Sequence, residues 1–117
     1  LGDVYKRQLV EGAGGAFSPL ALDGLNIDMM RLIKSFNILV VKDELGCISS
    51  TIANIYAFQK YKTNLDLIIL NTSKKNKMDN LTEIRKYTKL PVINYKGISS
   101  IRDISRKIST VLKLSNR

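Results

Sequence analysis

The sequence predicts an α/β protein built on a parallel sheet. Short runs of apolar, β-branched residues alternate along the chain with longer segments in which apolar residues recur every three to four positions. The short runs are continuously apolar, which is typical of strands that are buried on both faces of a parallel sheet. At 117 residues the chain forms at most one domain.

The expected elements follow one another in strict alternation. We expect strands at 9–10, 37–41, 65–70 and 91–95, and helices at 27–36, 47–61, 80–88 and 101–112. Asn26 is the expected cap of the first helix, Asn80 with Glu83 marks the start of the third, and Ser100 with Asp103 marks the start of the last. Ligands of such folds lie beyond the carboxyl ends of the strands, so the segments that follow each strand are the ones to examine.

The charge of the chain is unevenly distributed. Residues 1–59 hold 5 Lys and Arg against 6 Asp and Glu, whereas residues 60–117 hold 14 against 4, and the net charge is +9. A basic half can indicate nucleic-acid binding. The chain is rich in Ile, Lys and Asn throughout, however, and no aromatic residues lie among the lysines of 74–77. We therefore interpret 74–77 as a solvated loop and expect no nucleic-acid partner.

Residue types that are rare or missing exclude several classes of site. The chain contains no histidine, which excludes a Ser-His-Asp triad, a histidine general base and most zinc sites. Its one cysteine, Cys47, cannot form an internal disulfide, as expected for a cytoplasmic protein. No apolar run approaches the roughly 18 residues of a membrane span, so no membrane partner is expected.

The first eight residues, LGDVYKRQ, differ in composition from everything that follows. We interpret residues 1–8 as a non-native leader that resembles translated adapter sequence, and residues 9–117 as the carboxyl-terminal part of a single domain.

Four segments that follow the expected strands carry the candidate chemistry, namely 11–15, 42–49, 71–73 and 96–99. In the first, Glu11 precedes Gly-Ala-Gly-Gly. A carboxylate suits Mg²⁺, and bare glycine amides can approach a phosphate, although a simple surface turn would have the same sequence. In the second, a helix amino terminus after Gly46 can bind a carboxylate. In the third, Asn71 can pair with an adenine edge or can simply form a turn.

Three motifs, LVEGAGGAFSPL, ILVVKDELGCISSTI and LIILNTS, resemble dethiobiotin synthetase in this order and at the expected intervals. The resemblance covers residues 9–99, about the carboxyl-terminal half of that family's chain. It implies a three-layer fold like that of P-loop NTPases, truncated at its amino terminus, and a cytoplasmic homodimer. It also implies an ATP- and Mg²⁺-dependent ligase that carboxylates 7,8-diaminononanoate with CO2 and closes the ring of dethiobiotin, in biotin biosynthesis.

The resemblance also assigns residues. Glu11 matches the magnesium carboxylate, and Gly12, Ala13 and Gly14 match the loop beside the nucleotide phosphates. The match to the segment that binds the substrate's carboxylate tail, across the dimer, comprises Gly46, Cys47, Ile48 and Ser49. The match to the nucleotide-binding positions after the last two strands comprises Asn71, Thr72, Gly97, Ile98 and Ser99.

The chain departs from the family in several places. The Walker A pattern G-x-x-x-x-G-K-[ST] is absent from these 117 residues, so we expect the isolated chain to be inactive, with no catalytic residue of its own. Ser49 and Ser50 stand where the family often has Asn and His. Two alternatives stay open: a related amidotransferase-type synthase such as cobyrinic acid diamide synthase, which a downstream glutaminase domain would favour, and a non-catalytic, degenerate nucleotide-binding module, which an absent upstream P-loop would favour.

Overall fold

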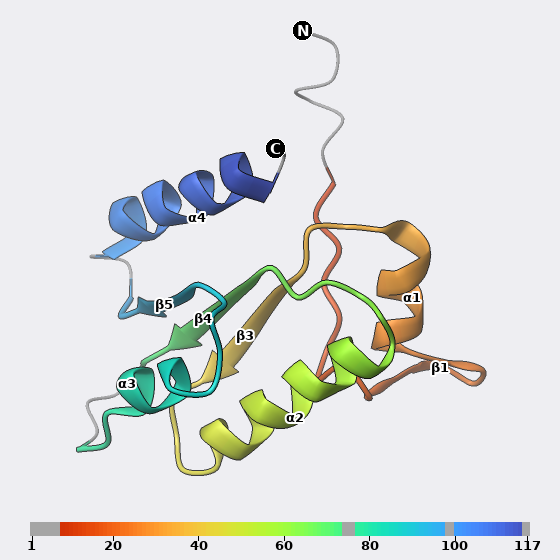
Figure 1. The fold of residues 1–117 in the computed structure, drawn as a ribbon, viewed down its shortest axis with the longest axis horizontal. Coiled ribbons are helices and arrows are strands. Elements are labelled where there is room, and N and C mark those ends of the chain that lie inside the picture. The colour runs from red at the N-terminus through yellow and green to blue at the C-terminus, as the bar shows by residue number, and fades with distance from the viewer. Residues whose placement is uncertain (1–7, 74–76, 98–99, 116–117) are drawn as a thin grey trace, which may run out of the picture.

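The chain folds as a parallel sheet with helices on both faces, as the sequence predicts. The structure is a computed structural model that describes residues 8–73, 77–97 and 100–115. The elements, shown in Figure 1, are β1 (Pro19–Ala21), β2 (Gly24–Leu25), α1 (Asn26–Ile33), β3 (Ile38–Lys42), α2 (Cys47–Lys60), β4 (Leu67–Asn71), α3 (Asn80–Arg85), β5 (Val92–Tyr95) and α4 (Ile101–Ser115).

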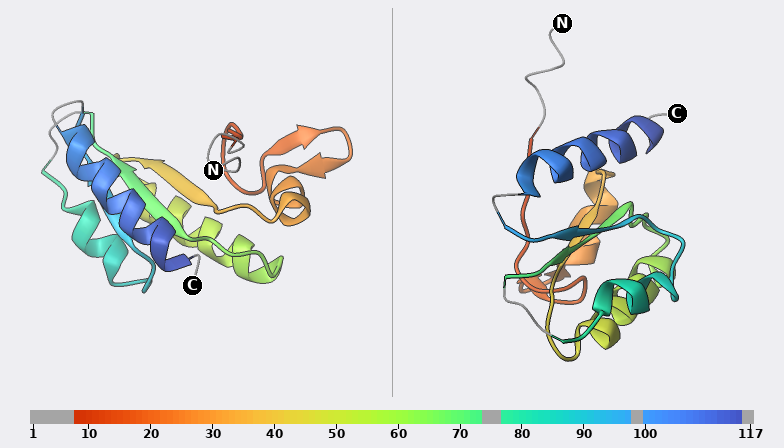
Figure 2. Two further views of the ribbon diagram at one scale, coloured as in Figure 1. Left: turned by 90° about the horizontal axis from the view of Figure 1, so that it is seen from above. Right: turned by 90° about the vertical axis from the view of Figure 1, so that its left-hand side faces the viewer.

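The central sheet has the order β3-β4-β5, and both of its strand pairs are parallel. Ile38 is in register with Leu67, and Ile68 with Val92. Helices α2 and α3 cover one face of this sheet and α4 covers the other, which gives three layers (Figures 1 and 2). All three strands therefore end at the same edge of the sheet, where a ligand site is expected.

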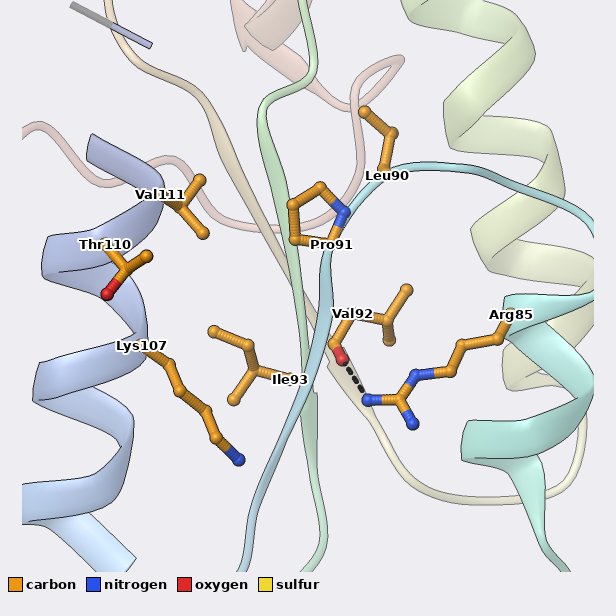
Figure 3. Close-up of a pocket in the computed structure, with 8 residues that line it drawn as sticks. All are labelled: Arg85, Leu90, Pro91, Val92, Ile93, Lys107, Thr110 and Val111. Atoms are coloured by element: carbon orange, nitrogen blue, oxygen red, sulfur yellow. Dashed lines mark hydrogen bonds between the residues drawn. The ribbon is translucent and has the colours of Figure 1, made fainter. Parts of the chain in front are cut away.

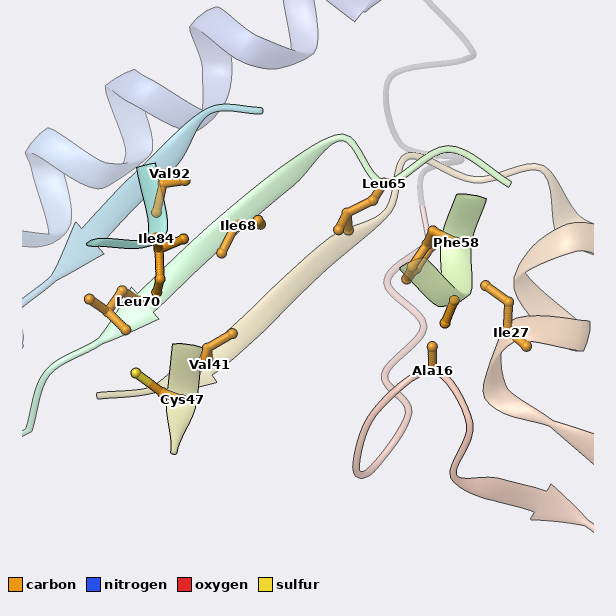
Figure 4. Close-up of a cluster of buried hydrophobic side chains, with 11 residues drawn as sticks. Ala16, Ile27, Val41, Cys47, Phe58, Leu65, Ile68, Leu70, Ile84 and Val92 are labelled. Carbon is orange, nitrogen blue, oxygen red and sulfur yellow. The ribbon is translucent and has the colours of Figure 1, made fainter. Parts of the chain in front are cut away.

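Two apolar clusters hold the layers together. The larger one lies between the sheet and helices α2 and α3 and includes Phe58 from α2 and Ile84 from α3 (Figure 4). The smaller one lies under α4 and is built on Leu67, Ile93 and Ile104. The alternation of strand side chains between these clusters explains why the strand sequences are continuously apolar.

Helix α4 contacts β5 and leaves β3 uncovered on that face. Two apolar side chains of β3 are exposed as a result, Ile38 at 37% and Val40 at 61%. The apolar stripe of α4 is buried as predicted at Ile104 and partly at Ile108, but Ile101 at the first turn is 50% exposed.

The structure corrects three expectations in the amino-terminal part. Residues 9–10 form no strand, and Leu9 is fully exposed, because none of the described strands pairs with this segment. Leu25, not Asn26, caps α1, and its N–H donates to Asp28 Oδ2 at 2.8 Å. Helix α1 ends at Ile33 because Lys34 adopts a left-handed conformation with φ of 49°.

Two further corrections concern later elements. Helix α3 is capped by Asp79 rather than Asn80, because the Asp79 carboxylate accepts the N–H of Thr82, and the helix ends at Arg85 instead of near Thr88. The antiparallel hairpin of β1 and β2, near the amino terminus, was not predicted, and it projects with α1 from one side of the molecule (Figure 2). The bounds of α3 and the presence of the hairpin were hard to predict because these segments are short and carry no periodic pattern.

Candidate functional site

The loop at 12–15 is held in place by three polar side chains from other parts of the chain. The Asn26 amide donates to Ala13 O at 2.9 Å and to Gly15 O at 3.0 Å. The Ser18 hydroxyl accepts the N–H of Gly15 at 3.0 Å. Asn54 Oδ1, on α2, accepts the N–H of Ala16 at 2.7 Å. The loop is therefore a fixed structure rather than a free surface turn.

These contacts leave a row of backbone donors available. Within the described part of the chain, the N–H groups of Gly12, Ala13 and Gly14 have no hydrogen-bond acceptor, whereas those of Gly15 and Ala16 are occupied. Gly14 has a φ of 79°, which turns the loop and favours glycine. Successive amides exposed in a turn form a concavity that suits an anion such as phosphate.

A hollow of about 430 Å³ lies between this loop, the end of β3 and the start of α2. Gly14 lines it on the loop side, and Gly46 and Cys47 line it on the helix side. Lys42 and Glu44 form an exposed ion pair at 3.5 Å and both line the same hollow, so their charges offset each other there. The structure thus brings parts of two separately predicted segments to one hollow, Gly14 and Gly15 of 11–15 and Gly46 and Cys47 of 46–49.

The start of α2 is arranged to leave donors open toward solvent. Gly46 is the N-cap, with a φ of 95°, and nothing lies within 4 Å of the position that a Cβ would take. The N–H of Cys47 is bonded to Glu44 O, whereas Ile48 and Ser49 occupy helix positions for which α2 itself supplies no acceptor. The amides of Ile48 and Ser49 are therefore the donors that a carboxylate would meet.

Cys47 is buried, at 4% exposure, and its side chain packs in the core. Burial raises the pKa of the Cys47 thiol, which disfavours the reactive thiolate. Cys47 contributes backbone and packing at this site.

A network of polar side chains joins the carboxyl ends of the three strands. The Asp43 carboxylate accepts the hydroxyl of Thr72 at 2.7 Å and the amide of Asn80 at 2.7 Å. Asn94 donates to Thr72 Oγ1 at 2.7 Å and to Leu70 O at 3.0 Å. The hydroxyl of Thr72 is thus committed to this network.

Asn71 ends β4 at the same edge and is half-buried. Its side-chain amide has no hydrogen-bond partner among residues 8–73, 77–97 and 100–115, so it can both donate to and accept from a ligand. Gly97, after β5, has a φ of 105° and its carbonyl accepts the Ser100 hydroxyl. Ile98 and Ser99, the other predicted residues after β5, lie outside the described residues.

Glu11 lies in irregular structure just before the glycine loop, with an exposed side chain. Within the described ranges, no group of three or more Cys, Asp or Glu residues is arranged to hold a metal ion. A single carboxylate still fits Mg²⁺, which keeps several waters and is usually bound through one or two carboxylates together with phosphate oxygens.

A second hollow lies at the opposite, amino-terminal end of β5, between α3 and α4 (Figure 3). It measures about 450 Å³ and has mostly apolar walls. Both of its cations are engaged, because Arg85 donates to Val92 O at 2.7 Å and Lys107 pairs with Asp103 at 2.9 Å. It is separate from the strand ends where the candidate residues gather.

Comparison with known proteins places the chain in a family. A family model described as an AAA domain matches residues 2–99. The chain belongs to the AAA domain family. The AAA domain assignment agrees with the parallel sheet flanked by helices on both faces.

Curated relatives of this AAA domain chain share one name. The chain is 36% identical over 104 residues to the ATP-dependent dethiobiotin synthetase BioD of Vesicomyosocius okutanii, a match that covers 89% of this chain and 48% of the relative. It is 30% identical over 104 residues to the protein of the same name from Ruthia magnifica, and 35% identical over 89 residues to that from Campylobacter jejuni. The matches cover 48% and 43% of those two relatives. The chain spans about half the length of the curated relatives it matches.

None of the helices described is long and apolar enough to cross a membrane.

Some polar side chains build the site from a distance and were not predicted as site residues. They are Ser18, Asn26, Asp43, Asn54, Asn80 and Asn94. The only signal for them was the position of Asn and Ser next to the predicted motifs, since contacts of a side chain with a distant backbone leave no period in the sequence.

Proposed function

We propose that this chain forms the part of an ATP-dependent dethiobiotin synthetase that holds the substrate tail and flanks the nucleotide. The observation that carries the proposal is the hollow of about 430 Å³ in which the glycine loop faces the start of α2. Gly14, whose N–H is unbonded among the described residues, lines one wall, and Gly46 and Cys47 at the start of α2 line the other. The other unbonded amides, of Gly12 and Ala13 and of Ile48 and Ser49, belong to residues that adjoin these two walls in the sequence. The two walls offer donors to two separate anions, a nucleotide phosphate at the loop and, at the start of α2, the carboxylate tail of a substrate that is held across the dimer.

The start of α2 binds the carboxylate tail of 7,8-diaminononanoate in this proposal. The amides of Ile48 and Ser49 donate to the carboxylate, and the helix dipole favours its negative charge. Gly46 gives the chain its left-handed turn, and Cys47 anchors the segment in the core. The side chain of Ser49 has only a secondary role because the backbone makes the contact.

The loop at 12–14 lies beside the nucleotide phosphates. The amides of Gly12, Ala13 and Gly14 donate to phosphate oxygens, and Glu11 holds Mg²⁺. Magnesium supplies neutralisation of the phosphate charge when it is bound. The chain's own contribution is positioning, since phosphoryl transfer to a carbamate depends on alignment and charge more than on a protein proton shuttle.

Asn71 recognises the adenine edge through its side-chain amide, which has no partner among the described residues, and Gly97 follows the neighbouring strand β5. For Ile98 and Ser99 the proposed nucleotide contact rests on the resemblance alone. Thr72 acts indirectly, because its hydroxyl is bonded to Asp43 and Asn94 and so fixes the backbone next to Asn71. The free amide of Asn71 at a strand end supports this assignment.

We further propose that the enzyme is a cytoplasmic homodimer in which the partner completes the substrate site. Apolar side chains exposed on the projecting hairpin and α1 support an association surface there, among them Leu22 at 111% and Leu32 at 83% exposure. Exposed apolar patches of this kind mark interaction sites more often than isolated apolar residues do.

A chimeric enzyme tests the proposed function. Residues 9–117 replace the matching half of the Vesicomyosocius okutanii relative, and the purified chimera receives diaminononanoate, bicarbonate, ATP and Mg²⁺. We expect dethiobiotin, detected by mass spectrometry, and growth without biotin of bacteria that lack their own dethiobiotin synthetase. The same bacteria fed dethiobiotin control for the rest of the pathway. A folded chimera that makes no dethiobiotin, beside an active parental relative, would reject the proposal.

A further inference from the structure

We propose that Asn54 is a positioning residue that ties the glycine loop to α2 and so holds this loop in the place where it meets its ligand. The nature of that ligand rests on the proposed function, but the tie itself rests on contacts of this chain alone. Asn54 lies on α2, 38 residues beyond Ala16 in the sequence, and it lines the hollow together with Gly14 and Gly46.

Both functional groups of the Asn54 amide are used. Its Oδ1 accepts the N–H of Ala16 at 2.7 Å, and its Nδ2 donates to Ser50 O at 2.8 Å. Ala16 is 4% exposed, so its N–H depends on this acceptor. If the side-chain amide of Asn54 were rotated by half a turn, its Nδ2 would face the N–H of Ala16 and its Oδ1 would face Ser50 O, and neither hydrogen bond would form. The side chain is therefore held in one orientation.

The contacts of Asn54 continue to the start of α2. Asn54 bonds to Ser50 O one turn earlier, and the N–H of Ser50 bonds to Gly46 O at 3.1 Å. A continuous path of hydrogen bonds thus runs from Ala16 through Asn54 and Ser50 to Gly46. It connects the loop that faces one ligand to the N-cap that faces the other.

Close packing explains why residue 15 is glycine. A Cβ on Gly15 would lie 3.0 Å from Asn54 Oδ1 and 3.3 Å from Asn54 Nδ2. Gly15 does not have a positive φ, unlike Gly14, so its backbone conformation alone would accept alanine. The contact with Asn54 is what disfavours a side chain at Gly15, because the Asn54 amide would have to move away from the N–H of Ala16 to make room for it.

A double-mutant cycle in the chimera tests this contact. In the parent, Gly15→Ala should raise the unfolding equilibrium constant in urea by about tenfold, because a methyl group is forced into a filled space. In an Asn54→Ala background the same substitution should change it by less than about threefold, because the space is then open. If the effects of Gly15→Ala and Asn54→Ala on the free energy of unfolding were additive, the inferred contact between residue 15 and Asn54 would be wrong.

Gly12→Ala is the matched control for the cycle. Its Cβ would meet the side chain of Asn26 at 3.0 Å, not that of Asn54. Gly12→Ala should therefore be destabilising to the same degree with and without Asn54. Coupling of Gly12→Ala to Asn54→Ala would show that the loop responds as a whole, which would overturn a specific role for the Asn54–Gly15 contact.

The kinetic test separates positioning from simple stability. Misplacing two reacting groups by about 1 Å costs roughly 100-fold in rate. Asn54→Ala should therefore lower kcat per folded molecule by about 10- to 100-fold, while the KM values for ATP and the diamine stay within about threefold. Gln59→Ala, on an exposed part of the same helix, should leave kcat unchanged. An unchanged kcat in Asn54→Ala would overturn the positioning role.

Amide exchange of Ala16 distinguishes failure of this inference from failure of the proposed function. Asn54→Ala should speed exchange of the Ala16 amide by about tenfold or more, and Gln59→Ala should not. If the chimera makes no dethiobiotin but the cycle and the exchange show the tie, the proposed function fails and the structural connection stands. If exchange of Ala16 is unchanged, the connection itself is wrong whatever the chimera catalyses.

Discussion

Asp43 is the residue whose removal should disturb the candidate site most directly from the sheet side. Its carboxylate accepts one hydrogen bond from Thr72 and one from Asn80, each at 2.7 Å. Asn80 is 5% exposed, so Asp43→Ala would leave a buried amide without this acceptor. The substitution also frees the backbone that follows Asn71.

The magnitude follows from these contacts. A hydrogen bond to a charged group contributes about 1.5–3 kcal/mol, and an unsatisfied buried donor costs about 1–3 kcal/mol. Asp43 is half-buried, so water can replace part of the loss at Thr72. We therefore expect Asp43→Ala to lower the free energy of unfolding by about 2–4 kcal/mol. With an m-value of about 2 kcal/mol/M, the urea midpoint falls by about 1–2 M.

The assay is urea unfolding of the chain in a Val40→Lys background, in which the aggregation expected of the isolated chain is suppressed, followed by far-UV circular dichroism near 15 °C, where stability is close to its maximum. Trimethylamine N-oxide at a constant concentration keeps the parent chain folded at the start of the titration. Asp43→Asn should give an intermediate loss, because an amide can accept one of the two bonds but presents a donor to the other partner.

Glu44→Gln is the matched control, since Glu44 is the neighbouring carboxylate and makes only an exposed ion pair with Lys42 at 3.5 Å. It should change the free energy of unfolding by less than about 0.5 kcal/mol. The reasoning is refuted if Asp43→Ala unfolds within 0.3 M urea of Glu44→Gln at an equal m-value, because that is well below the shift of about 1–2 M expected from two lost bonds.

Four other outcomes are expected. In the chimera, Gly46→Pro should raise the KM for the diamine by about tenfold or more but leave that for ATP nearly unchanged, because proline cannot adopt a positive φ, whereas Ser49→Ala should have little effect in the same substrate titrations. Glu11→Gln should raise the Mg²⁺ concentration needed for half-maximal rate, and an unchanged rate at limiting Mg²⁺ would make Glu11 a turn residue. The isolated chain should aggregate through the uncovered face of β3, and Val40→Lys should suppress light scattering without changing the circular dichroism spectrum. Cys47 should react with iodoacetamide at least about tenfold more slowly in the native chain than in urea, since burial raises its pKa; equal rates by mass spectrometry would show an open site.

The sheet was predictable because its strands are buried on both faces. The runs at 37–41, 65–70 and 91–95 all form parallel strands, displaced by one or two residues at their ends. The run at 9–10 has the same apolar character but forms no strand, because a strand also needs a neighbour to pair with. For so short a run the apolar pattern alone predicts neither pairing nor burial, since Leu9 is fully exposed.

Helix faces were predicted less well than helix positions. In the sequence, Ile48, Ile52, Ile55 and Tyr56 are spaced as on one face of a helix, which predicts that this face of α2 is buried, but Tyr56 is 65% exposed. The side chains that are buried include Thr51 and Ala57. Thr51 is accommodated because its hydroxyl donates to Cys47 O at 2.7 Å. Local hydrogen bonding of this kind lets a polar residue enter the core where a hydrophobicity pattern places it outside.

The glycine loop shows why the site could be located from the sequence but not explained. The glycines of 12–15 suggested bare amides facing a phosphate, and the amides of Gly12 and Gly14 have no acceptor among the described residues. Two of the glycines have a second cause, since a Cβ on Gly12 or Gly15 would lie only 3.0 Å from an asparagine side chain, which would have to shift. Those asparagines lie 14 and 39 residues farther along the chain, at Asn26 and Asn54, and only the fold brings them to the loop. A tight turn and an anion site are therefore compatible at this loop. Packing against Asn26 and Asn54 fixes the turn, and among the described residues the N–H groups of Gly12 and Gly14 stay available for the ligand that we propose.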